Sequence, residues 1–371
     1  MTLRAGIIGA GFMAGVHARS IRIAGGSVAG VVASSPARSS EARTTLKAAR
    51  AFDTAAELIA DDGIDVLHIC TPNSTHAEFA LAAIAHGKHI VCEKPLATIL
   101  TDAQTLSEAA TAAGLVAVVP FVYRFHPMAR HVRERVRSGL AGEIFSVQAS
   151  YLQDWMSRPE DTDWRVQSNL GGPSRAFGDI GSHLVDMIEF VLDDRIATVT
   201  ARLRTVYPAR SGRYTVDTED LAAVLFETRS GTVGTLLVSQ VAPGRKNALA
   251  FELSGALESL VFRQESPEEL WVGRRQGSES LLRSLDLGGE VARLSAAPAG
   301  HPLGYLDAFA AFIGDTYAVI DGTARPGLPT FADGVRAASV TEAVLESARV
   351  GATVTVIESQ PLTSQPSDAN L

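Results

Sequence analysis

Two short stretches of this sequence place side chains suited to proton and charge chemistry. Lys94 stands in the run 93–95, Glu-Lys-Pro, directly after the apolar residues 89–92. A lysine ammonium there can stabilise negative charge that develops on an oxygen atom. Asp179, His183 and Asp186 are spaced to share one face of a helix that runs to about Leu192. A histidine on such a face can exchange a proton with an alcohol near neutral pH.

Each of these residues also has a structural interpretation. A single lysine near a strand end is ordinarily a solvated surface group, and Asp179 could cap a helix while His183 packs at the edge of a core. A metal site is a third interpretation, but Asp-x-x-x-His with both cysteines far away in the sequence lacks a convincing ligand set. We therefore expect no metal ion. Cys70 and Cys92 both end apolar runs, which favours buried free thiols.

A glycine-rich turn near the start of the chain predicts a dinucleotide site. Residues 9–14 read Gly-Ala-Gly-Phe-Met-Ala, between an expected strand and an expected helix. Gly9 allows a tight turn, Gly11 lets the backbone approach a pyrophosphate, and Ala14 lets the helix and the strand pack closely. The N–H groups at the start of the helix then face the phosphates, so Phe12 and Met13 are expected at the cofactor as well.

The end of the second strand bears on which cofactor binds. An acidic residue there would bind the ribose 2′-hydroxyl of NAD, but this chain has Ser34, Ser35 and Arg38 and no acid. Hydroxyl donors and a guanidinium suit a 2′-phosphate. NADP is therefore favoured over NAD. The alternative is that Arg38 is an exposed residue in the first turn of a helix.

The first 121 residues alternate strands with helices, which predicts right-handed βαβ units and a parallel Rossmann sheet. Expected strands lie at 4–8, 28–33, 65–70, 89–92 and 116–120, and expected helices at 17–24, 38–50, 55–60, 77–86 and 101–113. Ligands of such sheets bind beyond the carboxyl ends of the strands. We therefore expect the cofactor along these strand-end residues: Thr71, Pro72, Asn73, His76, Glu93 and Lys94. Asn73 or Ser74 could equally cap the next helix.

After Pro120 the regular alternation of expected strands and helices ends. The expected strands are now long and alternating, at 144–152, 198–207, 220–227, 231–241, 248–254, 258–263 and 269–272, with late helices at 304–320 and 334–348. This pattern predicts an α+β domain with a large open, mainly antiparallel sheet. We assign residues 1–121 to a cofactor domain, 122–358 to a substrate and oligomerisation domain, and 359–371 to a polar tail. The basic cluster 130–137 is expected to be the solvated face of a helix.

Size and composition support two soluble domains and exclude some partners. The chain has 371 residues, of which 46% are hydrophobic, and carries a net charge of −8. This charge argues against nucleic acid and against an anionic membrane surface. There is no signal-peptide pattern and no apolar run long enough to span a membrane. We expect a cytoplasmic protein.

In this order, the glycine turn, the Glu-Lys-Pro run and the segment GG…D-I-G-S-H-x-x-D give the chain a family resemblance. Over essentially its whole length it resembles the glucose-fructose oxidoreductase / inositol dehydrogenase / MocA family. The resemblance implies hydride transfer between a nicotinamide cofactor and a secondary hydroxyl or ketone of a sugar, cyclitol or related polyol. Lys94 would contact the reacting oxygen, His183 would take the alcohol proton, and Asp179 would orient the substrate or the catalytic groups. A proton role for Lys94 itself stays open.

The resemblance also implies a substrate cleft and an assembly. Beside the three residues above, the side chains expected to line the cleft are Tyr123, Arg124, Tyr151, Asp154, Trp164 and Arg165, while His301 and Tyr305 could close it. Family members often associate through the open sheet, so a homodimer or homotetramer is expected.

Two other functions occur on this fold. One is a glycosidase that retains its nicotinamide and oxidises the sugar only transiently. The other is a cofactor-sensing regulator that has lost the catalytic residues, which is disfavoured because Lys94, Asp179 and His183 are all present. The sequence names neither the substrate nor the direction of the reaction.

Overall fold

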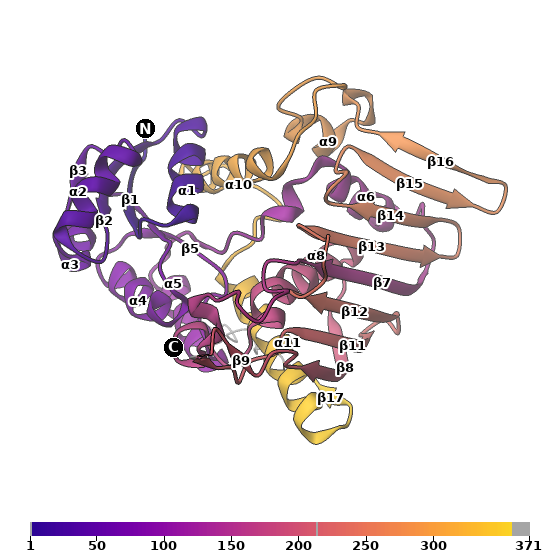
Figure 1. Ribbon diagram of the computed structural model, residues 1–371. Helices are drawn as coiled ribbons and strands as arrows, with labels where there is room; N and C mark the ends of the chain where they lie inside the picture. Colours follow the sequence, from indigo (N-terminus) through magenta and orange to yellow (C-terminus); the bar gives the residue numbers. More distant parts are fainter. Residues whose placement is uncertain (1, 213, 358–371) are drawn as a thin grey trace, which may run out of the picture.

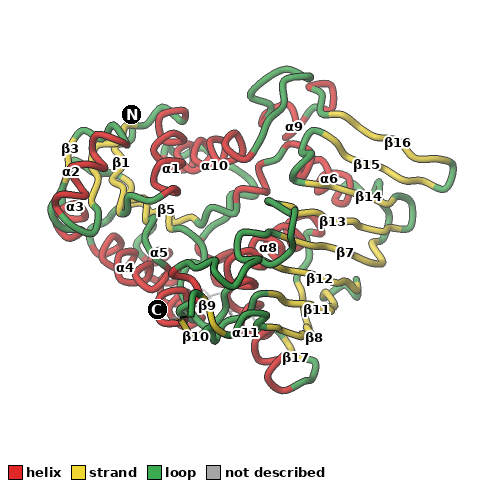
Figure 2. The backbone as a smooth tube through the Cα atoms, in the orientation of Figure 1, coloured by secondary structure: helices red, strands yellow, loops and turns green. Residues whose placement is uncertain are grey.

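The described residues form two main sheets and one small two-stranded sheet, with helices packed around and between the two main sheets (Figure 1). The structure is a computed structural model, and it describes residues 2–212 and 214–357. The expected polar tail, 359–371, lies outside the described residues. Figure 2 shows the smaller sheet enclosed by helices on the left and the larger sheet on the right. The described residues contain no helix long and apolar enough to cross a membrane.

The first sheet has six parallel strands in the order β3-β2-β1-β4-β5-β6, which is the doubly wound Rossmann order. The strands are β1 (Arg4–Ile8), β2 (Ser27–Val32), β3 (Arg50–Ala51), β4 (Val66–Ile69), β5 (His89–Cys92) and β6 (Ala117–Val118). The helices between them are α1 (Phe12–Ile23), α2 (Pro36–Thr45), α3 (Ala55–Ala60), α4 (His76–Ala85) and α5 (Leu100–Ala112). Apart from Arg4, His68 and His89, the central strands β1, β4 and β5 have no polar side chains, as expected where helices cover both faces of the sheet.

Two helix boundaries differ from expectation in ways that matter for the site. Helix α1 begins at Phe12 rather than at residue 17, so Phe12 and Met13 form its first turn. Helix α2 ends at Thr45 rather than at residue 50, because Lys47 takes a left-handed backbone conformation with φ 52°.

The second sheet has nine strands in the order β16-β15-β14-β13-β7-β12-β11-β8-β17. All neighbouring pairs are antiparallel except β7 with β12, so the sheet is mixed but mainly antiparallel, as expected. The strands are β7 (Ile144–Leu152), β8 (Ile196–Arg204), β11 (Leu221–Thr228), β12 (Val233–Ser239), β13 (Ala248–Gly255), β14 (Ser259–Arg263), β15 (Glu269–Arg274), β16 (Gly277–Leu282) and β17 (Val354–Thr355). β16 and β17 were not predicted, and neither was the small pair β9 (Ala209–Arg210) and β10 (Tyr214–Thr215).

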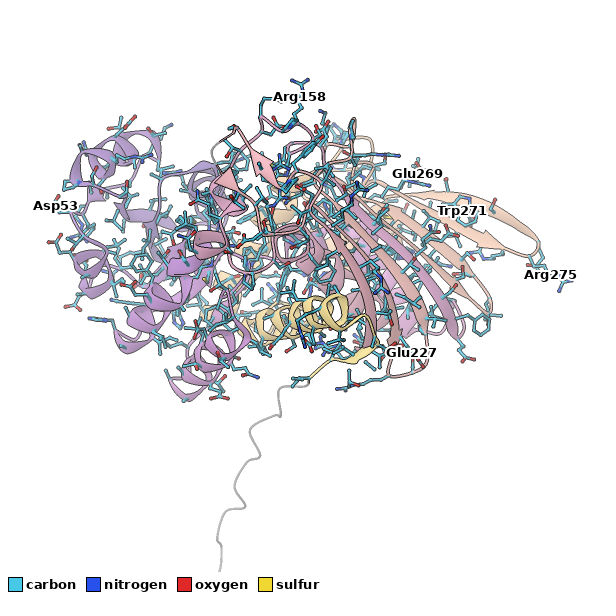
Figure 3. The ribbon with its side chains drawn as sticks, turned by 60° about the horizontal axis from the view of Figure 1, so that its bottom comes forward. Asp53, Arg158, Glu227, Glu269, Trp271 and Arg275 are labelled. Carbon is cyan, nitrogen blue, oxygen red and sulfur yellow. The ribbon has the colours of Figure 1, made fainter. Side chains whose placement is uncertain are left out.

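Helices cover only one face of this sheet. α6 (Pro127–Arg137), α8 (Ser182–Leu192) and α11 (Phe331–Val350) pack against it, and buried residues alternate with exposed ones along β11 and β12. Such alternation is typical of a sheet with one solvated face. Figure 3 shows the strands side by side, with Arg275 beyond the end of β15 and Asp53 of the first part at the opposite end of the molecule.

The chain returns to the first sheet after the second is complete. α10 (Tyr305–Ile320) packs against α1, and α11 packs against α5 as well as against β8. The core of the Rossmann part therefore includes residues from beyond 300. The remaining helical segments are short: α7 (Ser168–Gly171) and α9 (Gly289–Leu294), the 3₁₀ turns 73–75, 122–125, 164–166 and 285–287, and a π-helical turn, Phe177–Gly181.

The expectation that the basic cluster on α6 is solvated was wrong for three of its residues, although Arg137 is exposed. Arg130, His131 and Arg135 are buried rather than solvated. Arg130 Nη1 lies 3.1 Å from Glu290, and Arg135 Nη2 donates to Glu258 at 2.6 Å. The acidic partners come from segments more than a hundred residues later in the chain, so the local charge pattern gave no sign of them.

Candidate active site

A cavity of about 1160 Å³ lies between the carboxyl ends of the Rossmann strands and the start of α8. Most of the side chains predicted for the site line it, and they come from both sheets. Those lining residues are Gly9, Gly11, Phe12, Met13, Ser34, Arg38, Thr71, Pro72, Asn73, His76, Glu93, Lys94, Tyr123, Tyr151, Trp164, Arg165, Asp179, His183 and Tyr305. The sequence-based grouping thus corresponds to one continuous space.

The glycine turn has the form that a pyrophosphate requires. Gly9 has φ +118°, and a Cβ there would lie 2.5 Å from the carbonyl oxygen of Cys70. Gly11 precedes α1 without any side-chain cap, and nothing lies within 4 Å of a Cβ built on it. The first N–H groups of α1 are therefore left for a ligand, and the space beside Gly11 is open. These residues fit a dinucleotide.

Of the three polar residues after β2, Ser35 caps a helix, while Ser34 and Arg38 line the cavity. Ser35 caps α2, accepting a hydrogen bond from the backbone N–H of Arg38 at 3.4 Å, and does not line the cavity. Ser34 and Arg38 do line it, and Arg38 Nη1 lies 3.4 Å from Ser34 Oγ. Arg38 is exposed and has no carboxylate partner among the ion pairs of the described residues.

Asn73 and His76 hold the strand ends in place as well as lining the cavity. Asn73 donates to the carbonyl oxygen of Gly171 at 2.9 Å and so ties the Rossmann part to the second part. His76 is buried, and its ring nitrogens lie 2.8 Å from the carbonyl oxygen of Pro95 and 3.0 Å from that of Thr71. The Lys94–Pro95 peptide bond is cis. These contacts fix the path of the chain around Lys94.

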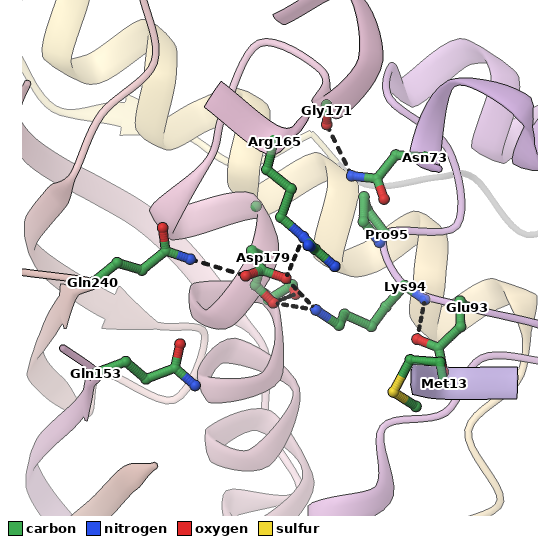
Figure 4. A network of polar contacts seen from close by, with 12 residues as sticks. Met13, Asn73, Glu93, Lys94, Pro95, Gln153, Arg165, Gly171, Asp179 and Gln240 are labelled. Carbon is green, nitrogen blue, oxygen red and sulfur yellow. Dashed lines mark hydrogen bonds and ion pairs between the residues drawn. The ribbon is translucent and has the colours of Figure 1, made fainter. Parts of the chain in front are cut away.

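Lys94 and Asp179, which both line the cavity, form an ion pair (Figure 4). Lys94 Nζ donates to the carboxylate of Asp179 and also to its backbone oxygen at 2.9 Å. Gln240 donates to Oδ2 of Asp179 at 2.9 Å, and Arg165 Nε lies 3.7 Å from Oδ1, the oxygen that Lys94 binds. Burial alone would raise the pKa of Asp179, but Lys94 and then Arg165 outweigh it and bring this pKa to about 2. Asp179 is therefore a carboxylate at neutral pH.

His183 is a buried, neutral base one turn beyond Asp179. Its Nδ1 has no hydrogen-bond partner among the described residues, and the ring packs edge-on against Phe121 and Tyr123. Burial, followed by the charge of Lys94, lowers the pKa of His183 well below its ordinary value. An uncharged imidazole beside an ammonium can accept a proton from a hydroxyl group held between them.

The expected helix from Asp179 begins differently from the prediction. Residues 177–181 form a π-helical turn, and the α-helix starts only at Ser182. Asp186 does not line the cavity, because it pairs with Arg124 beneath the site. The expected face of three residues therefore reduces to Asp179 and His183.

Comparison with known proteins agrees with this geometry. Residues 3–121 match the model of an oxidoreductase family with an NAD-binding Rossmann fold, and residues 129–261 match a GFO/IDH/MocA C-terminal domain. Levoglucosan dehydrogenase of Pseudarthrobacter phenanthrenivorans is 32% identical over 318 residues, covering 78% of this chain and 80% of that protein. This chain belongs to the GFO/IDH/MocA family. It is accordingly an NAD-binding oxidoreductase.

Other members of the family are similar over much of the chain. Inositol 2-dehydrogenase of Paracoccus denitrificans is 33% identical over 237 residues, which cover 63% of this chain and 66% of the inositol dehydrogenase. A solved structure of levoglucosan dehydrogenase in complex with NADH superposes with a TM-score of 0.91 at 29% identity, covering 97% of this chain and all of that one.

Three of the family-derived substrate residues lie away from the cavity. Arg124 is buried against Asp186 and lies 2.7 Å from Asp333, so its guanidinium pairs with two carboxylates. Asp154 accepts from Lys246 at 2.7 Å and from the backbone of Gly244 at 3.0 Å. His301 is exposed and also lies outside the lining. Arg124 and Asp154 thus each form ion pairs, and neither is among the residues that line the cavity, so their contact with substrate stays a prediction.

The structure adds amide side chains that sequence reasoning missed. Asn247 accepts from Tyr151 at 2.6 Å and donates to Tyr123 at 3.0 Å, and the two tyrosine oxygens lie 2.6 Å apart. Gln153 donates to Asn247 at 3.0 Å. The amides have no spacing or motif that marks them, and only the pairing of β13 with β7 brings them beside the tyrosines.

The two cysteines and the acidic residues offer no metal centre in the part of the chain described. No group of three histidine, cysteine or acidic side chains there is placed to hold an ion. Cys70 and Cys92 are free thiols, and burial raises the pKa of each.

Proposed function

We propose that this enzyme transfers a hydride between a nicotinamide cofactor and a secondary alcohol carbon of an uncharged sugar or cyclitol. The observation that carries the proposal is the arrangement of Lys94, Asp179 and His183 around one space that continues to the glycine turn. Bound nicotinamide would supply the hydride acceptor or donor. The relatives support the substrate class, since they are named as dehydrogenases of levoglucosan and inositol.

The protein side chains would handle the proton and the charge. In alcohol oxidation, neutral His183 accepts the hydroxyl proton through the nitrogen that faces the cavity. Lys94 stabilises the negative charge that grows on the oxygen. Asp179 keeps the lysine ammonium oriented, and Gln240 fixes the carboxylate in turn. In ketone reduction the same groups would act in reverse.

An uncharged substrate is proposed because the cations near Lys94 are already paired. Lys94 pairs with Asp179, and Arg165 lies 3.0 Å from Asp163. A phosphate or carboxylate on the substrate would have to displace one of these acids. Tyr123, Tyr151 and the two nearby amides offer hydroxyl and amide groups instead, which suit the hydroxyls of a polyol.

For the cofactor, we propose a preference for NADP over NAD. It is supported by the position of Arg38 and Ser34 on the cavity wall without an acid beside them. NAD is the alternative, and NADH is the form bound in a solved relative.

The test follows nicotinamide absorbance with the purified full-length protein, given NAD and NADP separately with a panel of sugars, cyclitols, sugar acids and sugar phosphates. We expect turnover with an uncharged ring alcohol, and loss of turnover with unchanged cofactor affinity in Lys94→Ala. Normal turnover by Lys94→Ala would refute the site. Retained cofactor with no net turnover would instead indicate a transient-oxidation glycosidase.

A further inference from the structure

A continuous chain of buried polar side chains runs from the cavity wall into the Rossmann core. Glu93 Oε1 lies 3.0 Å from His17 Nε2, and His17 Nδ1 lies 2.8 Å from His68 Nδ1. His68 Nε2 then lies 3.1 Å from the hydroxyl of Tyr317. The four residues come from β5, α1, β4 and α10, and all are buried. Only Glu93 reaches the cavity, beside Lys94 (Figure 4).

The hydrogen-bond partners determine where the protons of this chain lie. The Tyr317 hydroxyl has a single partner among the described residues, so it donates to His68 Nε2. Neutral His68 then carries its hydrogen on Nδ1 and donates to His17. His17 in turn carries its hydrogen on Nε2 and donates to Glu93. Every donor points toward the carboxylate, and every polar atom of the chain is satisfied.

A doubly protonated, positively charged His17 would leave the buried Tyr317 hydroxyl hydrogen without a partner among the described residues. If His17 held hydrogens on both nitrogens, His68 would have to donate to the Tyr317 oxygen, and the tyrosine hydrogen would have no partner there. Burial lowers the pKa of His68 well below its ordinary value, which also favours a neutral His68 ring. Glu93 is thus a carboxylate held by a neutral chain instead of by a cation.

Among the described residues, Glu93 is therefore the one carboxylate near Lys94 in the cavity lining that is not paired with a lysine or arginine side chain. Apart from Arg38, which lies beside Ser34 after β2, the charged lining residues are two cations, Lys94 and Arg165, and three carboxylates, Asp163, Asp179 and Glu93. Asp179 and Asp163 each pair with one of the cations. The net charge of the five is therefore −1, and Glu93 carries it.

We propose that His17, His68 and Tyr317 are positioning residues that keep Glu93 anionic at the cavity wall, so that the site binds the oxidised, positively charged nicotinamide in preference to the neutral reduced form. This rests on the cofactor binding assigned above. An anion at a fixed place stabilises a nearby cation more strongly in a cavity than in bulk water. The three buried residues, by keeping Glu93 anionic, thereby favour the oxidised form of the cofactor, which accepts a hydride.

The test measures the dissociation constants of both cofactor forms by calorimetry with the full-length protein. In Glu93→Gln the ratio of oxidised to reduced affinity should fall about tenfold, since the fixed charge is lost and the shape is kept. In Tyr317→Phe we expect a fall of about threefold in the same direction, because the last donor of the chain is removed. Tyr207→Phe is the matched control, since its hydroxyl donates to Ser157 in the other part of the protein and its ratio should not change.

The outcomes separate this inference from the proposed function. An unchanged ratio in Glu93→Gln, or equal weakening of both forms, would overturn the role of Glu93. If neither form binds the wild-type protein, the cofactor assignment itself fails. Should Glu93→Gln not fold, Tyr317→Phe decides the point, together with ¹⁵N spectra of the wild-type histidines. Those spectra should show neutral His17 with its hydrogen on Nε2, and a doubly protonated ring would contradict the proposal.

Discussion

Individual side chains divide into those whose role follows from their neighbours in sequence and those whose role depends on distant partners. Lys94, Asp179 and His183 stand in recognisable runs, and the structure brings all three to one cavity. Arg124 and Asp154 carry the same charges as site residues but are neutralised by partners far along the chain. Gln240 and Asn247 are the reverse case: they contact site residues but were not predicted, because no motif marks an amide on or beside a strand. Ion pairing and strand register therefore limit what sequence predicts at this scale.

The pH dependence of alcohol oxidation should report His183. Its pKa is lowered by burial and by Lys94, so the imidazole stays neutral as the pH falls through the ordinary histidine range. The rate at low substrate concentration should therefore hold from neutral pH down to about 6.5 and decline only below that value. His183→Asn should turn over about a hundredfold or more slowly and lose this decline. A decline centred at or above pH 7 in the wild-type enzyme would contradict a depressed pKa.

Cofactor choice should depend on Arg38. Arg38→Ala removes a guanidinium that is free to contact a 2′-phosphate, so NADP affinity should fall by about tenfold to a hundredfold while NAD affinity changes little. Arg43→Ala is the control, because Arg43 is an exposed residue of the same helix that does not line the cavity. Equal losses for both cofactors would show that Arg38 does not distinguish them.

At the level of helices and strands, the pattern of the sequence predicted most of the fold. β1, β5 and β7 occur within the expected ranges because apolar and β-branched runs mark them. β16 was missed because its first four residues, Gly-Ser-Glu-Ser, are small or polar and exposed and resemble a loop. The π-helical turn before α8 was missed too, since nothing in Phe-Gly-Asp-Ile-Gly distinguishes a wider turn from an ordinary helix. That turn sets the position of Asp179, so the pattern located the site without giving its geometry.

The turn before α1 offers a test confined to one element. Gly9→Ala would place a Cβ 2.5 Å from the Cys70 carbonyl oxygen at φ +118°, so the turn must shift, at a cost of about 1–3 kcal/mol. Cofactor affinity should fall at least about tenfold, because the N–H groups of α1 move with the turn. In Gly15→Ala, within the helix and with open space around it, affinity should hold and stability should rise by about 1 kcal/mol. Calorimetry and thermal unfolding of both variants measure the contrast, and equal effects would contradict it.

The whole molecule is organised so that the second half of the chain completes the first. α10 fills the core beneath α1 and supplies Tyr317 to the buried chain of histidines, and α11 bridges α5 and the large sheet. A division at residue 121 follows the change from parallel to mixed sheet. The compact units in space nevertheless share these late helices, which no local pattern assigns to the first domain. The cavity depends on both halves, since Asn73 is bonded to Gly171 and Lys94 to Asp179.

The uncovered face of the large sheet should be where copies of the chain associate. Apolar side chains lie on it in two pairs of neighbouring strands, with Leu225 and Leu237 on β11 and β12 and the half-buried Val261 and Trp271 on β14 and β15. Apolar side chains exposed on a solvated sheet favour burial against a second copy. Leu237→Glu should therefore convert the assembly to monomers, measured as mass by sedimentation velocity. Leu81→Glu on α4 is the control. Leu81 is 42% exposed, close to the 44% of Leu237, but Leu81 lies in the Rossmann part of the molecule.

The same pair of variants tests whether the site needs the assembly. The cavity residues described above lie at the Rossmann strand ends and at the start of α8, away from the uncovered sheet face that carries Leu237, so monomeric Leu237→Glu should bind cofactor with unchanged affinity. A wild-type protein that sediments as a monomer, or a Leu237→Glu variant that keeps the wild-type mass, would contradict association through this face. Loss of cofactor affinity along with the change in mass would show instead that a neighbouring copy supports the cavity, since the substitution lies on the sheet face opposite to the packed helices.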